Sequence, residues 1–281
     1  MHSGPITLRL MTYNICNGFD GFDDPELDDG PAKSPESLEA VASVIQAANP
    51  DVIALQEVEN DSVLDDLAAY HQLSRKFPHR ALISGGDRRG LDVALLSRYP
   101  ISTSKLHSER IVGWRGKMPV RSRRGLLQCD IQLPLGKTLR VFVNHLPCLR
   151  DDARKSERLQ FEEATTFREI ITEQSQSYPA HFQVVMGDFN SLEGSRVLDL
   201  LTEHKRYPRL VNTSANLPPS YGHRFDDPGH WLSNRIDHIL CDTELARHVV
   251  SSETFRHPVE KMASDHLPVI TDFQLPGPQA A

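Results

Sequence analysis

Acidic, amide and imidazole side chains recur in this sequence directly beside apolar segments, where they could take part in chemistry. They come from stretches that lie far apart along the chain: Asn14, Glu57, His145, Asp188, Asn190, Asp237, Asp265 and His266. Carboxylates and imidazoles transfer protons and position water, and carboxylate and amide oxygens bind cations. This combination is typical of a hydrolytic site that a fold assembles from many strands.

The donor atoms indicate which metal such a site would take. Glu57, Asp265 and Asn14 offer oxygen atoms, which Mg²⁺ prefers. Zinc would favour clusters of His or Cys, and the sequence has neither an H-E-x-x-H motif nor cysteines at zinc-ligand spacing. The sequence therefore predicts a hard divalent cation rather than zinc.

Each of these residues also has a purely structural interpretation. Glu57 could be a solvated carboxylate at the end of a strand, and Asp188 could cap a turn in the GDFN stretch. His145 could be a half-buried histidine whose hydrogen bonds are satisfied, and Asp265 and His266 could cap the last strand or a helix. Taken one at a time, the residues leave both interpretations open.

Apolar segments next to these residues predict the elements that would carry them. Strands are predicted at residues 6–14, 51–55, 91–97, 125–133, 138–145, 182–188, 236–241 and 268–273. Helices are predicted after Ser34, over residues 152–174 and after Ser195. This interspersed order predicts one α/β domain over residues 1–275, followed by a disordered tail at 276–281. In α/β proteins ligands bind at strand ends, where the polar residues lie.

Composition narrows the class of protein. The chain has 281 residues and a formal net charge of −7, which argues against a protein whose main task is tight, non-specific binding to nucleic acid. A nuclease stays compatible, because a bound metal supplies local positive charge. The four cysteines form no C-x-x-C pair, and we expect free thiols. Without a signal-peptide pattern or a long apolar run, we expect a cytoplasmic protein with no membrane span, and a monomer by default.

Seven short motifs follow one another in an order found in a known family. They are LMTYNI, LQEV, GLDVALLSRYPI, VNHL, GDFNS, RIDHIL and SDHLPV. From Leu8 to Phe273, the chain resembles the endonuclease/exonuclease/phosphatase superfamily, which includes exonuclease III-like and deoxyribonuclease I-like enzymes. The resemblance implies a deoxyribonuclease I-like four-layer α/β sandwich, with two packed mixed β-sheets flanked by helices. It also implies hydrolysis of a phosphate ester that depends on Mg²⁺ or Mn²⁺.

The resemblance implies a set of metal ligands. Glu57 is similar to the principal ligand of the family, with Asn14 and Asp265 beside it. Cys16 departs from the exonuclease III pattern, in which an aspartate stands two residues after the asparagine. That difference argues against a second metal ligand at this position and, more weakly, against an abasic-site endonuclease.

The resemblance also implies the catalytic roles. Asp188, held by Asn190, would position or deprotonate the attacking water. His266, oriented by Asp237, and His145 would contact the phosphate. The expected reaction is in-line attack of water on phosphorus.

Charge patterning bears on the substrate. Residues 105–124 contain seven Lys or Arg and one acid, Glu109, which is consistent with a track for a polyanion or with a solvated edge. We expect Arg121, Arg89, Trp231 and His145 to bind substrate. The GDFNSLEGS and NRIDHIL stretches lack the motifs of the inositol polyphosphate 5-phosphatase branch. Their absence favours a nuclease or phosphodiesterase.

Three hypotheses follow from these observations. The favoured one is a nuclease that acts on DNA or RNA. The second is a phosphoesterase that acts on a small molecule or a lipid headgroup. The third is a catalytically silent binding module, which is disfavoured because every reacting residue is present.

Overall fold

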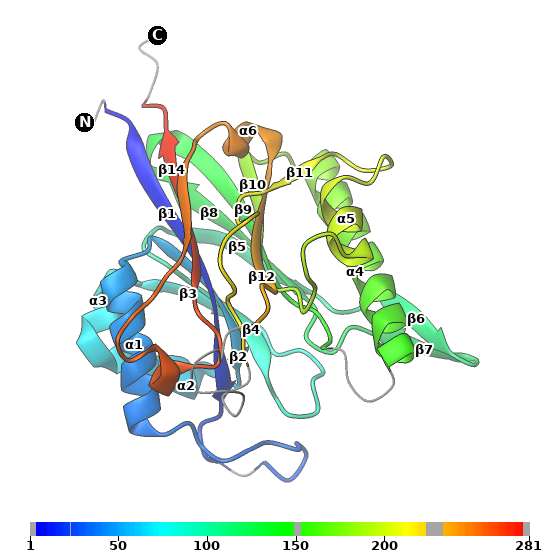
Figure 1. Ribbon diagram of the computed structural model, residues 1–281, viewed down its shortest axis with the longest axis horizontal. Coiled ribbons are helices and arrows are strands. Elements are labelled where there is room, and N and C mark those ends of the chain that lie inside the picture. Colours follow the sequence, from blue (N-terminus) through cyan, green and yellow to red (C-terminus); the bar gives the residue numbers. More distant parts are fainter. Residues whose placement is uncertain (1–3, 23, 149–152, 223–232, 278–281) are drawn as a thin grey trace.

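Two six-stranded sheets lie face to face at the centre of the structure (Figure 1). The computed structural model describes residues 4–22, 24–148, 153–222 and 233–277. Helices cover the outer face of each sheet, so the layers run helix, sheet, sheet, helix (Figure 1). The predicted four-layer α/β sandwich is confirmed.

The first sheet has the strand order β13-β14-β1-β2-β4-β3. Its strands, in chain order, are β1 (Ile6–Gly18), β2 (Val52–Val58), β3 (His79–Leu82), β4 (Asp92–Ser97), β13 (Val249–Thr254) and β14 (Val269–Leu275). Strand β1 pairs in parallel with β2 and antiparallel with β14. The sheet is therefore mixed.

The second sheet has the order β11-β12-β10-β9-β8-β5. Its strands are β5 (Ile101–His107), β8 (Leu126–Leu133), β9 (Lys137–His145), β10 (Phe182–Asp188), β11 (Leu210–Asn212) and β12 (Asp237–Asp242). Strand β10 pairs in parallel with β9 and antiparallel with β12. A separate hairpin consists of β6 (Ile111–Arg115) and β7 (Met118–Arg121).

Each outer face is covered by its own helices. The helices are α1 (Pro35–Ala48), α2 (Asp61–Ala69), α3 (Leu73–Lys76), α4 (Ala153–Ser177), α5 (Arg196–Thr202), α6 (Thr243–Ala246) and α7 (Glu260–Ala263), with short 3₁₀ turns at Tyr70–Gln72 and Pro134–Gly136. In Figure 1, α1, α2 and α3 lie beside the first sheet, and α4 and α5 lie beside the second. None of the described helices combines the length and apolar character needed to cross a membrane.

Three apolar layers hold the sandwich together. The central layer joins the two sheets and includes Leu10, Val93, Val141 and Ile239. A second layer packs α1 and α2 on the first sheet, and a third packs α4 and α5 on the second. Burial of apolar surface contributes about 25 cal/mol per Å². These layers therefore supply the rigid frame on which the strand ends are held.

Helix α1 begins where its sequence predicts. Ser34 is the N-cap, and its side chain accepts a hydrogen bond from the backbone N–H of Ser37. Pro35 occupies the first turn, where its missing N–H costs nothing. Asn49 ends the helix in the left-handed conformation.

The eight interior strands of the two sheets are the eight strands that the sequence predicts. The four edge strands, β3, β5, β11 and β13, were not predicted. Interior strands of a covered sheet are buried on both faces and produce apolar runs, whereas β5 and β13 are largely exposed. Apolar patterning in the sequence therefore predicted the interior strands and not the edge strands.

Strand polarity brings the predicted site residues to one end of the sandwich. Strands β1, β2, β9 and β10 all end there, because each sheet has a central parallel pair. Strands β12 and β14 run antiparallel to them, so their first residues lie at the same end. Of the tail predicted at 276–281, residues 278–281 lie outside the described residues.

Candidate active site

Side chains from the two sheets meet where β10 ends and where the regular pairing of β1 with β2 is interrupted after Asn14. Asn14 belongs to the first sheet and Asp188 to the second, and Asn14 Nδ2 donates a hydrogen bond to Asp188 Oδ2 at 3.1 Å. Both side chains are buried. A buried polar contact of this kind fixes the relative position of the two sheets at this end.

The sheet register places two more predicted residues beside Asp188. Asp188 lies level with His145 on β9 and with Asp237 on β12. His145 Nε2 is 3.4 Å from Asp188 Oδ2. The backbone N–H of Asn190 donates to Asp188 Oδ1 at 2.8 Å, while the Asn190 side chain donates to the carbonyl of Leu146. Asn190 thus holds Asp188 through its backbone and braces the turn with its side chain.

Burial changes the proton affinity of Asp188. Burial raises its pKa, the nearby charge of Asp237 raises it further, and the value reaches about 7. Hydrogen bonds from Asn190 and Asn14 oppose the increase. A carboxylate whose pKa lies near neutrality is suited to accept a proton.

His266 is held by a carboxylate behind it. Its Nδ1 lies 2.9 Å from Asp237 Oδ2, which also accepts a hydrogen bond from Ser220 Oγ at 2.6 Å. The ring of Tyr221 packs against the imidazole, with centroids 4.6 Å apart. His266 Nε2 faces Asp188 Oδ2 at 3.8 Å. This arrangement orients the imidazole toward the centre of the site.

The two histidines differ in charge. Burial lowers the pKa of His266, but the charge and hydrogen bond of Asp237 outweigh it and raise the pKa to about 10. Burial lowers the pKa of His145 well below its ordinary value, and the positive charge of Arg124 lowers it further. At neutral pH His266 is therefore an imidazolium and His145 is neutral.

Glu57 occupies a strained position at the end of β2. Its φ of 62° lies in the left-handed region, and the pairing of β2 with β4 is irregular between Gln56 and Val58. The half-buried carboxylate accepts a hydrogen bond from the backbone N–H of Asn17 at 2.7 Å. Cys16 and Asn17 also have positive φ. Strain of this kind persists only where the surrounding structure enforces it, and it is common at functional sites.

The carboxylates of Asp265 and Glu57 both lie near the thiol of Cys16. Burial raises the pKa of Cys16 to about 12, and the charges of Asp265 and Glu57 contribute to the increase. Ser264 Oγ donates to the carbonyl of Asn14 at 2.7 Å and lies 3.4 Å from Asp265 Oδ1. Asp265 is therefore tied to the end of β1, on the side of the site where Glu57 lies.

Glu57, Asp265 and Asn14 offer oxygen atoms of the chemical type that a hard divalent cation takes. Both carboxylates are half-buried, so substrate and water can reach them. Asn14 Oδ1 accepts one hydrogen bond, from the backbone N–H of Cys16, and a carbonyl oxygen has a second lone pair. Two carboxylates and an amide oxygen match the partial protein coordination that Mg²⁺ prefers.

A second group of donors also lies close enough for a metal. Ligand atoms of Asp188, Asp237 and His266 lie within 4.8 Å of one another, and all three residues are buried. A metal there would have to displace the hydrogen bond between His266 and Asp237, or take its place. The half-buried oxygens of Glu57 and Asp265 take no part in that hydrogen bond.

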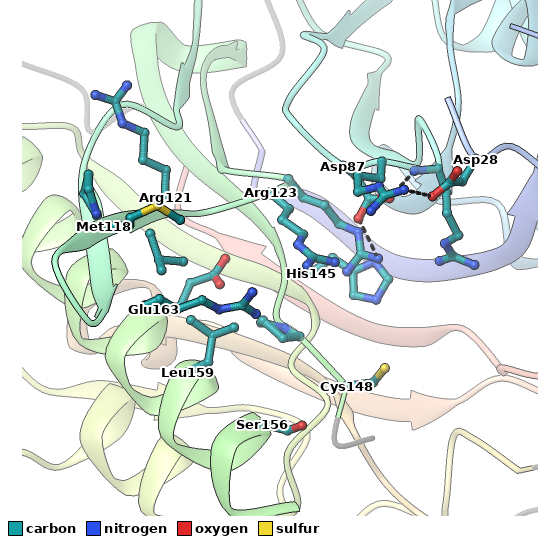
Figure 2. Close-up of a pocket in the computed structure, with 17 residues that line it drawn as sticks. Asp28, Asp87, Met118, Arg121, Arg123, His145, Cys148, Ser156, Leu159 and Glu163 are labelled. Carbon is teal, nitrogen blue, oxygen red and sulfur yellow. Dashed lines mark hydrogen bonds and ion pairs between the residues drawn. The ribbon is translucent and has the colours of Figure 1, made fainter. Parts of the chain in front are cut away.

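A pocket of about 690 Å³ opens beside His145 (Figure 2). Six arginines line it, from two loops and the β6–β7 hairpin: Arg88, Arg89, Arg115, Arg121, Arg123 and Arg124. Arg89, predicted to bind substrate, lines this pocket and donates to Asn17 Oδ1 at 3.2 Å. Arg121 also lines it, but its guanidinium pairs with Glu109 at 2.6 Å and points away from His145 (Figure 2). Trp231, the remaining predicted substrate residue, lies outside the described residues.

Three residues of the site were not identified from the sequence. Ser220 and Ser264 each hydrogen-bond a site residue, but serine in a loop carries no distinctive pattern. Arg124 belongs to the basic run at residues 105–124, whose charge is evident from the sequence but whose position beside His145 is not. Only contacts between distant segments identify these residues.

Comparisons with known proteins agree with this geometry. The model of the endonuclease/exonuclease/phosphatase family matches residues 11–266. A comparison with curated proteins gives no significant match.

Solved structures share the fold. An endonuclease/exonuclease/phosphatase from Beutenbergia cavernae matches with a TM-score of 0.69 at 20% identity, over 98% of this chain and 73% of that chain. Mannosyl-6-phosphatase from Bacteroides thetaiotaomicron matches with a TM-score of 0.67 at 17% identity, over 94% and 98% of the two chains. TDP2 from Caenorhabditis elegans matches with a TM-score of 0.64 at 16% identity, over 96% and 74%. At these identities the likeness concerns the fold alone.

Proposed function

The chain belongs to the endonuclease/exonuclease/phosphatase family, and on that basis we propose that it hydrolyses a phosphodiester bond with the help of Mg²⁺ or Mn²⁺. The observation that carries this proposal is the buried contact between Asn14 and Asp188, with His145 and His266 on either side. It joins the expected metal ligands of one sheet to the expected proton acceptor of the other.

Asp188 is the proposed acceptor of the proton from the attacking water. Its raised pKa, near 7, suits that task, and Asn190 and Asn14 keep its two oxygens oriented. Transfer to a positioned base contributes about 10²- to 10⁴-fold to a rate. In-line attack then requires the phosphorus to lie on the open side of this carboxylate.

The two histidines are proposed to contact the phosphate in different ways. The imidazolium of His266, kept charged and oriented by Asp237, would stabilise negative charge that develops on the phosphate oxygens. The neutral ring of His145 would supply a hydrogen bond without adding charge. Glu57, Asp265 and Asn14 would hold the divalent cation, which offsets the negative charge of the phosphate and of the leaving oxygen.

A nucleic acid is the favoured substrate. The six arginines of the pocket beside His145 give positive charge to one wall of the site in a chain whose net charge is −7. Polynucleotides bind to such walls through their phosphates.

A small-molecule or lipid-headgroup phosphate is the second candidate. The pocket of about 690 Å³ has the size of a small-molecule site. One protein of the same fold is a mannosyl-6-phosphatase, which shows that the fold can serve a sugar phosphate. A silent binding module is disfavoured because all the proposed catalytic residues are present.

One set of assays separates these candidates. The purified chain is incubated with Mg²⁺ or Mn²⁺ and, separately, with a fluorescent oligonucleotide, bis-p-nitrophenyl phosphate and mannose 6-phosphate. We expect metal-dependent cleavage of the oligonucleotide that weakens steeply as salt increases. Turnover of mannose 6-phosphate alone would favour the second candidate. If no phosphate ester is cleaved with either metal, the proposed function is wrong.

A further inference from the structure

Two loops from different sheets build the arginine wall beside His145. The loop between β3 and β4 carries Arg89, and the segment between β7 and β8 carries Arg123 and Arg124. The backbone N–H of Gly86 donates to the carbonyl of Arg123, so the two segments are joined directly. The two segments approach so closely that a Cβ atom on Gly85 would lie 2.6 Å from the carbonyl oxygen of Arg123. The wall is a built surface rather than a chance approach of mobile side chains.

The carboxylates of the pocket are already engaged. Asp28 pairs with Arg88 at 2.6 Å, and Asp87 pairs with Arg124 at 3.2 Å. Glu163 is buried and accepts a hydrogen bond from Ser122. Its pKa is raised by burial to about 7, so it carries only part of a charge at neutral pH.

Positive charge in the pocket therefore exceeds negative charge. Among the described residues, Arg89, Arg115 and Arg123 have no carboxylate partner within ion-pair distance. Arg123 is exposed in the pocket, and its side chain extends on the side where His145 lies (Figure 2). An unpaired guanidinium in a concave site offers a fork of donors that matches the oxygens of a phosphate.

This surplus charge lies beside the reaction centre and not in it. His145 lines the pocket and also contacts Asp188, so the pocket and the catalytic centre share one wall. A phosphate held at Asp188 and His266 would leave Arg123 free to bind a different group of the same molecule.

We propose that Arg123, supported by Arg89 and by the Arg124–Asp87 ion pair, binds a second phosphate group of the substrate, next to the phosphate that is hydrolysed. The proposal rests on the proposed function and deepens it. It assigns the substrate to the compounds that carry two neighbouring phosphates. Such a pair occurs in a polynucleotide, whose adjacent phosphodiester would lie in the pocket, and in a small bisphosphate.

A pair of chromogenic substrates tests the proposal. Thymidine 5′-(p-nitrophenyl phosphate) carries the scissile phosphate alone, and its 3′-phosphorylated form adds one phosphate and changes nothing else. The kcat/KM of both is measured with Mg²⁺ for the wild type and for Arg123→Ala. We expect Arg123→Ala to lower kcat/KM for the 3′-phosphorylated substrate by at least about tenfold, which is the usual effect of losing a charge-assisted hydrogen bond. For the substrate without the 3′-phosphate, kcat/KM of the variant should stay within about twofold of the wild-type value.

Two further variants sharpen the test. Lys117→Ala removes the same charge from the exposed tip of the β6–β7 hairpin, outside the pocket lining, and should not change the preference between the two substrates. Arg123→Lys keeps the charge but loses the paired N–H donors of the guanidinium, so it should lose part of the preference for the 3′-phosphorylated substrate. An equal loss in Lys117→Ala and Arg123→Ala would show a long-range charge effect and overturn the proposal.

An oligothymidylate assay identifies where the second phosphate comes from. If Arg123→Ala slows hydrolysis of oligothymidylate, of the small substrate or of both, the subsite is supported. The substrate whose hydrolysis is slowed identifies the natural source of the second phosphate. If neither substrate is sensitive while both are hydrolysed, the subsite proposal fails and the proposed function stands. If no substrate is hydrolysed, the proposed function fails. Binding of thymidine 3′,5′-bisphosphate, measured by calorimetry, then decides the subsite by itself: tighter binding to the wild type than to Arg123→Ala supports it, and equal binding overturns it.

Discussion

His266 Nδ1 lies 2.9 Å from Asp237 Oδ2, and both residues are buried behind the mouth of the site. The carboxylate also accepts a hydrogen bond from Ser220, so its position is fixed from two directions. It keeps the imidazole charged and turned toward Asp188.

Asp237→Asn should lower kcat by roughly 100-fold or more, with a smaller effect on KM. The amide keeps the size of the side chain and removes the charge that sets the tautomer and the pKa of His266. Steady-state kinetics on bis-p-nitrophenyl phosphate give both constants. Ser220→Ala removes its hydrogen bond to the same oxygen and the acceptor of the Asp237 backbone N–H but keeps the carboxylate charge, so it should have a smaller effect on kcat. An Asp237→Asn variant with wild-type kcat would rule out this positioning role.

Asp188→Asn should lose at least about 100-fold in kcat and keep its fold, because an amide cannot accept the proton of water. The backbone N–H of Asn190 retains an acceptor in the variant. Circular dichroism and thermal unfolding check the fold, and turnover of the same substrate checks the activity. Asp199→Asn, a change of an exposed residue on α5, is the matched control. Full activity of the Asp188→Asn protein would refute the role of base.

Glu57→Gln should raise the Mg²⁺ concentration needed for half-maximal activity by about tenfold or more, since ligand charge sets the affinity of such sites. A readout without turnover is the rise in Tm when Mg²⁺ is added, which the variant should show only at higher Mg²⁺. Treatment of the wild type with EDTA should remove that rise. Equal Mg²⁺ dependence in variant and wild type would exclude Glu57 as a principal ligand.

Glu163→Gln should stabilise the protein at alkaline pH. Burial raises the pKa of Glu163 from 4.5 to about 7, so the folded state binds the proton more tightly than the unfolded chain does. The stability that this proton contributes is complete below pH 4.5 and is lost as the pH rises through about 7. The neutral amide avoids that loss, and the variant should gain on the order of 1–3 kcal/mol at alkaline pH and little in acid.

Denaturant unfolding of the two proteins at several pH values measures this difference. Glu157→Gln, at an exposed position on the same helix, should leave the pH dependence unchanged. A difference between Glu163→Gln and wild type that does not change with pH would contradict the assigned cause.

The interior of the fold was predictable from the sequence, and so was the placement of the candidate site residues near strand ends. Strand β10 was predicted with its observed limits, and Asp188 was expected at its end. Continuous apolar runs mark strands that are buried on both faces, and polar residues that follow such runs must lie at a sheet end. The edge strands were missed because β5 and β13 are largely exposed, and β3 and β11 have only 4 and 3 residues, so none of them carries a long apolar run.

Tertiary structure alone decided how the site residues differ from one another. His145 and His266 look equivalent in the sequence, yet they differ in charge. Burial and the charge of Arg124 lower the pKa of His145, whereas Asp237 outweighs burial and raises the pKa of His266. Arg121 and Arg123 stand two residues apart, yet only Arg121 pairs with Glu109. The pKa of a group and the direction of a side chain depend on neighbours brought from distant segments. Local sequence therefore determined which residues are present, and folding determined what each of them can do.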